Sequence, residues 1–219
     1  YDVNKWHKDN LQDFTIQWAA REFGLEYAED IGEIVSKYIK YNGRRKPEHI
    51  QPDTYSLINY KEAETVLYEY EELVKKAEKI YDNLPEDKRD AFFQLVLYPA
   101  RGSKNVLKLN VYTGLNYLYA KQGRAAANDY AELVEQTFRH EAADTDYYNQ
   151  SLADGKWNGI MMNGHIGQTG WRIPEENIMP QVKRIRLGRG SDMGISIEGT
   201  AKVWTESNAV IDGLPTFSS

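Results

Sequence analysis

The stretch from Pro85 to Gly123 constrains the fold more than any other part of this chain. Proline suits the first turn of a helix and glycine is a common helix stop, so we predict one long helix between them. A helix that is apolar on more than one side must be covered on more than one side, and the sequence therefore predicts a helical bundle around it. The apolar residues form two rows, one of Phe92, Val96, Pro99 and Val106, the other of Phe93, Leu97, Ala100, Leu107, Val111, Leu115 and Leu118.

Pro99 lies in the interior of this predicted helix. A proline there has no N–H to donate to the carbonyl four residues back, that of Leu95, and its ring crowds the same turn. We therefore expect the helix to bend at Pro99. A buried helix of this kind is a scaffold, so functional residues are sought in the loops around it.

Apolar residues at helical spacing predict further helices on both sides of the central one. Asn42 and Gly43 are expected to close the second of them. Together with the central helix they give about five helices, and the short turns around residues 85 and 123 predict that the last three run antiparallel. The other predicted helices cover residues 10–23, 26–41, 60–84 and 124–152.

The composition changes after the last predicted helix. Residues 153–182 are rich in glycine and tryptophan and predict an irregular segment. Apolar and polar residues then alternate around Ile185, Ile195 and Val203, which predicts strands. Because a stable sheet needs more strands, residues 183–219 are predicted to begin a truncated β domain. The expected organisation is a connector (1–9), a helical bundle (10–152), the irregular segment and this β tail.

Composition also argues against several classes of protein. The formal net charge is -6 with mixed signs throughout, whereas a nucleic-acid-binding protein would show a basic stripe. Cysteine is absent and no apolar run is long enough to cross a membrane. The four histidines lack the spacing of a metal site, so we expect neither metal nor cofactor. Because the sequence begins with Tyr1 rather than methionine, we expect a processed chain or a piece of a longer protein.

Arg44, Arg45 and Lys46 form the densest basic cluster and open a long loop that reaches Asn59. Cations are favoured at the C-terminal end of a helix, so a solvated helix end is one interpretation. The other interpretation is a binding site for a carboxylate or phosphate group, because the planar guanidinium of arginine can donate two parallel hydrogen bonds to such a group. The sequence leaves both open.

A second candidate lies between Lys156 and Arg172, where tryptophans, a histidine and side-chain amides stand among glycines. Such a segment can cap a bundle, or it can present flat rings and hydrogen-bonding groups to a polar ligand. Adjacent carboxylates such as Glu71-Glu72 and Glu175-Glu176 are expected to be solvated rather than a glycosidase acid–base pair.

Several of these motifs, in this order, resemble glycoside hydrolase family 115, the xylan α-glucuronidases. The similarity runs from about Trp6 to Pro180. The motifs are Tyr41-Asn42-Gly43-Arg44-Arg45-Lys46-Pro47-Glu48, Thr54-Tyr55-Ser56-Leu57 with Asn59-Tyr60, Leu95-Val96-Leu97-Tyr98-Pro99, and Lys156-Trp157-Asn158 with His165-Ile166-Gly167.

The resemblance implies a multidomain glycosidase with an N-terminal domain, a (β/α)8 catalytic barrel, a helical bundle and a C-terminal β-sandwich. Such enzymes remove glucuronic acid or its 4-O-methyl form from glucuronoxylan by an inverting mechanism, are commonly dimers, and are secreted or periplasmic. This chain would be the bundle and the first strands of the sandwich, with residues 1–9 as the exit from the barrel.

The resemblance also implies that no catalytic residue lies in this chain, since the acid and base would be on the barrel, its partner in the same parent protein. Alone, the chain is expected to be inactive and to support the barrel, the dimer and the edge of the cleft. The competing interpretation is a non-catalytic helical module that binds a protein or a glycan. Candidates for contact with substrate or barrel are Arg44, Arg45, Tyr55, Trp157, Asn158, His165 and Trp171.

Overall fold

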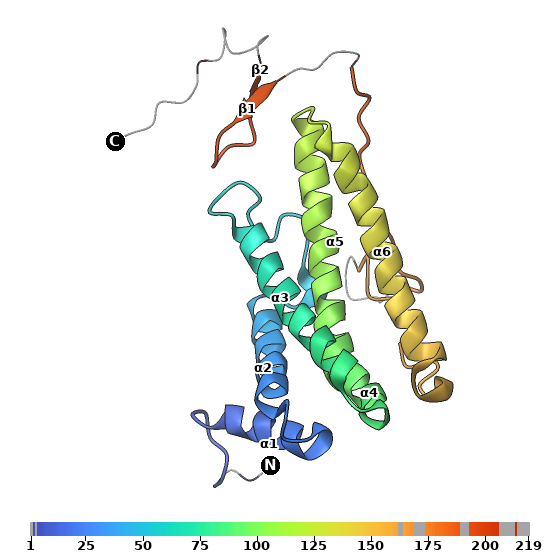
Figure 1. Ribbon diagram of the computed structural model, residues 1–219. Coiled ribbons are helices and arrows are strands. Elements are labelled where there is room, and N and C mark those ends of the chain that lie inside the picture. The colour runs from blue at the N-terminus through green and yellow to red at the C-terminus, as the bar shows by residue number, and fades with distance from the viewer. Residues whose placement is uncertain are drawn as a thin grey trace.

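The computed structural model describes residues 2, 4–161, 164–168, 174–188, 193–205 and 213, and it is mainly helical (Figure 1). This confirms the predicted fold class: long helices that pack side by side, followed by a short β segment. The elements are α1 (Leu11–Phe23), α2 (Ala28–Arg44), the 3-10 turn η1 (Pro47–His49), α3 (Glu62–Asn83), α4 (Glu86–Phe92), the π turn η2 (Phe93–Leu97), α5 (Tyr98–Lys121), α6 (Ala126–Gln150), the 3-10 turn η3 (Leu152–Gly155), β1 (Gly194–Ser196) and β2 (Val203–Thr205).

The predicted central helix is present as α4, η2 and α5, which follow one another without a break. Its irregular turn lies just before Pro99. The N–H of Tyr98 donates to the carbonyl of Phe93, five residues back instead of four. A π turn of this kind rearranges the bonding of the turn in which Pro99 can supply no donor to Leu95.

The central helix is buried on two sides, as its two apolar rows predict. Phe92 and Val96 from one row and Leu97 and Leu107 from the other are all fully buried. Each large apolar side chain removed from water in this way stabilises the fold by about 1.5–3 kcal/mol. Most of these side chains join one core with α1, α2 and α3, and α6 packs along the other side of α5 (Figure 1).

The prediction that Asn42 and Gly43 end the second helix is wrong, because α2 continues to Arg44. Asn42 is instead tied to two other helices. Its side-chain oxygen accepts a hydrogen bond from the Tyr70 hydroxyl at 2.6 Å, and its amide donates to Ser103 at 3.0 Å. These bonds hold the last turn of α2 in the bundle, so the chain leaves the helix only after it.

The β tail is confirmed in part. β1 and β2 pair antiparallel with Ile195 opposite Trp204, and in Figure 1 this hairpin lies beyond the ends of α3 and α5. The N–H of Gly199 donates to the carbonyl of Ile58 at 2.6 Å, which ties the hairpin to the loop before α3. The expected residues of further strands beyond Thr205, including Val210, lie outside the described residues.

The strand expected around Ile185 is not formed. Its backbone groups are bonded to helix side chains instead of to a neighbouring strand. The Asn116 side chain accepts from the N–H of Lys183 and donates to its carbonyl, both at 2.8 Å. Asn128 makes the same two bonds with Ile185, at 2.9 and 3.0 Å. We call these two pairs the asparagine clamps. They supply hydrogen-bond partners for the backbone N–H and C=O groups of Lys183 and Ile185, which have no strand beside them.

Candidate functional site

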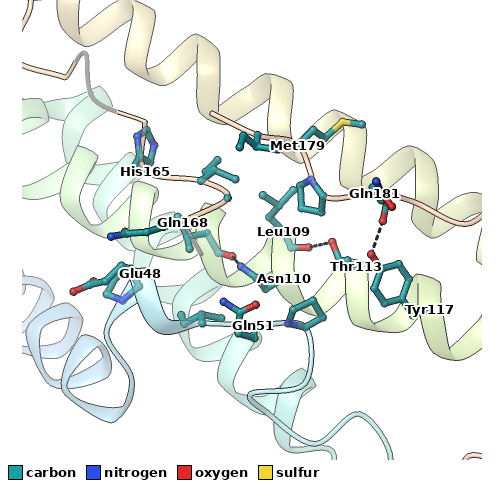
Figure 2. Close-up of a pocket in the computed structure, with 18 residues that line it drawn as sticks. Glu48, Gln51, Leu109, Asn110, Thr113, Tyr117, His165, Gln168, Met179 and Gln181 are labelled. Carbon is teal, nitrogen blue, oxygen red and sulfur yellow. Dashed lines mark hydrogen bonds between the residues drawn. The ribbon is translucent and has the colours of Figure 1, made fainter. Parts of the chain in front are cut away.

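A cavity lies between the loop after α2, helix α5 and the segment after α6. It consists of two adjoining hollows of about 290 and 530 Å³ that share part of their lining, including Glu48, His165 and Gln168. We call it the His165 cavity. In Figure 2, His165, Gln168 and Glu48 lie at one end and Tyr117 with Gln181 at the other, with α5 running between them. Three segments far apart in the sequence therefore form one site.

Glycines let these segments come close enough to form its walls. A Cβ atom at Gly114 would overlap the carbonyl oxygen of Pro52, so α5 and the loop can touch only because no side chain stands there. Gly167 has a φ of +85°, and a Cβ there would lie 2.6 Å from the Cβ of Ile178. Both positions need glycine for the close approach of backbone, and the second also needs it for its dihedral angle.

The central feature of the cavity is a buried carboxylate in contact with a half-buried histidine. Glu141 on α6 is 2% exposed, and its Oε1 is in hydrogen-bond contact with Nε2 of His165. Oε1 also accepts a hydrogen bond from the Thr145 hydroxyl at 3.1 Å. The other oxygen, Oε2, is buried and has no hydrogen-bond partner in the part of the chain that the structure describes. A buried carboxylate is costly without partners, and the contacts from His165 and Thr145 offset that cost.

Hydroxyl groups surround this pair. Burial raises the pKa of Tyr98 to about 12, so its phenol keeps its proton at neutral pH. Its oxygen lies 3.2 Å from the hydroxyl of Thr145, the residue that also bonds Glu141. Ser103 lines the same hollow and donates to the carbonyl of Pro99 at 2.8 Å. A carboxylate, an imidazole and hydroxyls in one recess can exchange hydrogen bonds with a polar, hydroxyl-bearing ligand.

Of the predicted site residues, His165 lines this cavity. The two arginines lie elsewhere. Arg44 pairs with Glu69 on α3, and its guanidinium lies 4.4 Å from the centre of the Tyr41 ring. Arg45 is exposed, and its Nε donates to the carbonyl of His49 at 3.0 Å. Arg44 therefore has a carboxylate partner already, whereas Arg45 is exposed and bonds a backbone carbonyl.

The aromatic candidates are also dispersed. Tyr55 and Trp157 are half-buried and pack against the main core. Asn158 is exposed in the turn that follows η3, where its N–H donates to the carbonyl of Gly155 at 3.1 Å. Trp171 lies outside the described residues. Within the described chain these residues do not gather with His165 around one ligand site, and their contact with substrate or barrel stays a prediction.

Sequence reasoning missed Glu141, although a signal for it exists. Ala127, Ala131, Val134 and Phe138 form the inward stripe of the last helix, and Glu141 is the next position on that stripe. A charged residue on a buried stripe is unusual enough to mark a pair or a site. Glu48, Tyr98 and Ser103 carry no comparable signal, because only the folded chain brings them to the same recess.

No three metal-ligating side chains come together among the described residues. In that same part of the chain, no helix is long and apolar enough to cross a membrane. The described site is a recess on the side of a helical bundle, and it contains a buried carboxylate in contact with an imidazole.

Comparisons with known proteins show what this chain is similar to. Residues 1–49 match the family model described as Glycosyl hydrolase family 115. The fold matches a solved structure of a family GH115 4-O-methyl-α-glucuronidase, BtGH115A, with specificity for decorated arabinogalactans. That match has a TM-score of 0.55 at 20% sequence identity and covers 87% of this chain but 27% of the other. No curated protein matches this chain.

These two findings confirm the resemblance to glycoside hydrolase family 115 that the sequence motifs predict. The sequence match covers the first two helices, and the structural match extends the same relationship in fold to most of the bundle. The chain spans about a quarter of the solved enzyme's length.

Proposed function

We propose that this chain is the helical-bundle region of a family 115 α-glucuronidase, and that its role is to support a catalytic barrel elsewhere in the same protein. The observation that carries the proposal is the agreement of two independent comparisons, the family match over residues 1–49 and the fold match over 87% of the chain. The barrel would supply the general acid and base, and the reaction would proceed with inversion, with a water between the two carboxylates.

The substrate class follows from the same relationship. An α-glucuronidase releases glucuronic acid or 4-O-methylglucuronic acid from a polysaccharide chain, and glucuronoxylan is the substrate we propose first. The solved relative has specificity for decorated arabinogalactans, which makes such a polymer the second candidate. A uronate carries a carboxylate, and an exposed arginine such as Arg45 suits that group.

Within the parent enzyme, the bundle would contribute surfaces rather than chemistry. Arg45 and Asn158 are exposed on loops and are the best placed of the candidates to reach a cleft edge, a barrel or a second subunit. Secretion of the enzyme and its assembly as a homodimer belong to the same proposal.

The test compares the isolated 219-residue chain with the longest protein that contains it, measuring release of 4-O-methylglucuronic acid from glucuronoxylan and from arabinogalactan. We expect no release by the isolated chain and release by the longer protein. Arg45→Ala in the longer protein should raise KM, with Lys40→Ala, an exposed lysine of α2, as the control. Unchanged kinetics would remove Arg45 from the proposal.

Two outcomes would overturn the assignment itself. Release by the isolated chain would place catalytic carboxylates inside it, and Glu48 and Glu141, which line one hollow, would be the first to replace. Absence of release by every protein containing the chain, together with glycan or protein binding by the bundle, would favour the non-catalytic module instead.

A further inference from the structure

A second recess lies on the bundle between α3, α5 and α6, and its lining is dominated by charge. It has a volume of about 250 Å³. Three of its cations, Arg101, Lys104 and Lys108, come from one face of α5, since they are three and four residues apart. We call this recess the Lys104 groove. Its lining residues are Glu78, Arg101, Lys104, Asn105, Lys108, Thr137, His140 and Asp144.

The acidic residues of the groove are already engaged. Arg101 donates to Glu78 from one nitrogen and to Asp144 from another, both at 2.9 Å. Asp144 also accepts a hydrogen bond from the Asn105 amide at 3.3 Å. The second outer cation, Lys108, pairs with Glu71 on α3 at 2.9 Å. Both cations on either side of Lys104 therefore have carboxylate partners.

Lys104 differs from both neighbours. Its side chain is half-buried, yet it has no hydrogen bond or ion pair with any residue that the structure describes. Burial lowers the pKa of Lys104, and the cations of Lys108 and Arg101 lower it further, against the opposing effect of Glu78 and Asp144. A partly desolvated ammonium group without a direct hydrogen-bond partner is unfavourable, and an anion in contact with it would relieve that cost.

We propose that the Lys104 groove is a binding site for a small oxyanion, a ligand that carries one carboxylate or phosphate group. The Lys104 ammonium would donate to the anion, and Lys108 and His140 line the same space as further positive or hydrogen-bonding groups. Charge-assisted hydrogen bonds of this type are short and strong. The proposal does not depend on the glycosidase assignment, because it rests on residues of the bundle alone.

The experiment is a titration of the 15N-labelled 219-residue chain with inorganic phosphate and, separately, with acetate. Sodium chloride keeps the ionic strength constant, and a chloride series alone serves as the anion control. We expect saturable shifts of the amide signals of Arg101, Lys104, Lys108 and His140 with at least one oxyanion. The two titrations show whether phosphate or carboxylate is preferred.

Variants assign the binding to the groove. Lys104→Met should weaken the Kd by about tenfold or more, the size of one lost charge-assisted hydrogen bond. It should not unfold the chain, because methionine fills a similar volume without an unpaired charge. Lys104→Arg should keep the site. Lys75→Met, which removes an exposed lysine of α3 near Glu72, should leave the Kd unchanged.

Saturable shifts that Lys104→Met abolishes and Lys75→Met retains would establish the site. Shifts that never saturate, that chloride reproduces, or that Lys104→Met leaves intact would overturn the proposal. Because these readouts involve neither polysaccharide nor barrel, they are independent of the outcome of the hydrolysis test.

Discussion

The His165 cavity and the Lys104 groove lie on two sides of helix α5, and they differ in whether the buried charged group has a partner within the chain. In the first, the carboxylate of Glu141 is almost completely buried, and the chain supplies its partner, His165. In the second, Lys104 is half-buried and the chain supplies no partner among the described residues. The first arrangement is expected to hold the fold together, whereas the second leaves capacity for a ligand.

The difference shows why burial alone does not identify a site. A buried charge that is paired within the chain costs stability when the pair is broken. A charge without a partner costs stability as it stands, so its removal is harmless to the fold and harmful to binding. Four substitutions are ordered below from the largest expected effect to the smallest, and the first and the last compare a buried charge with an exposed one.

His165→Ala should have the largest effect, because it leaves the Glu141 carboxylate buried without the imidazole that contacts it. We expect the free energy of unfolding to fall by about 3 kcal/mol, measured by urea denaturation at neutral pH. The double variant His165→Ala with Glu141→Gln should recover much of the loss, since it removes the buried charge. His140→Ala, on an exposed neighbour of Glu141, should change stability by about 0.5 kcal/mol or less. Equal losses at the two histidines would refute the structural role of the pair.

Gly114→Ala should come next, because it forces the wall of the His165 cavity apart. The new Cβ would overlap the Pro52 carbonyl, and we expect a loss of about 1–3 kcal/mol in thermal or urea unfolding. Gly102→Ala is the matched control in the same helix. Nothing lies within 4 Å of its new Cβ, so it should stabilise the chain by about 0.5–1 kcal/mol. Stabilisation by both substitutions would show that the loop does not pack on Gly114.

Asn116→Ala removes one asparagine clamp and leaves the backbone groups of Lys183 without their partners. We expect a loss of about 1–2 kcal/mol, and faster hydrogen exchange at the Lys183 amide. Exchange at Ile185 should change less, because Asn128 holds it separately. Unchanged exchange at Lys183 would mean that the clamp is not formed in solution.

Glu33→Gln tests an exposed ion pair against the buried one and should have the smallest effect. Hydrogen bonds from Lys37 and then from Lys76 lower the pKa of Glu33 to about 2. Since its pKa is lower in the folded state, Glu33 stabilises the fold above the ordinary carboxyl pKa and loses that contribution as the pH falls from about 4.5 to about 2. The side chain is 39% exposed, so solvent screening limits the effect to about 1 kcal/mol or less.

The measurement is urea unfolding of wild type and Glu33→Gln at several pH values. We expect the stability difference to be constant near neutral pH and to disappear towards pH 2. A difference that persists at the lowest pH would show that the effect comes from packing rather than from charge.

Much of the scaffold could be predicted from local pattern. The two apolar rows of residues 85–123 specified a helix buried on two sides, and the folded chain confirms it. The end of α2 could not be predicted, because Asn42 is held by Tyr70 and Ser103, which lie on other helices. The alternation around Ile185 predicted a strand, but its backbone groups are bonded to asparagine side chains rather than to another strand.

By itself, the sequence determined the helices, the absence of cysteine chemistry and the resemblance to family 115, because each depends on residue types and on spacing along one segment. The tertiary structure decided which charges are satisfied. Glu141 and His165 lie 24 positions apart and meet only when the segment after α6 folds back along α6. The carboxylates of α3 and α6 that lie near Lys104 pair directly with Arg101 and Lys108 instead. Pairing of this kind depends on distances in space, which spacing along the chain does not fix.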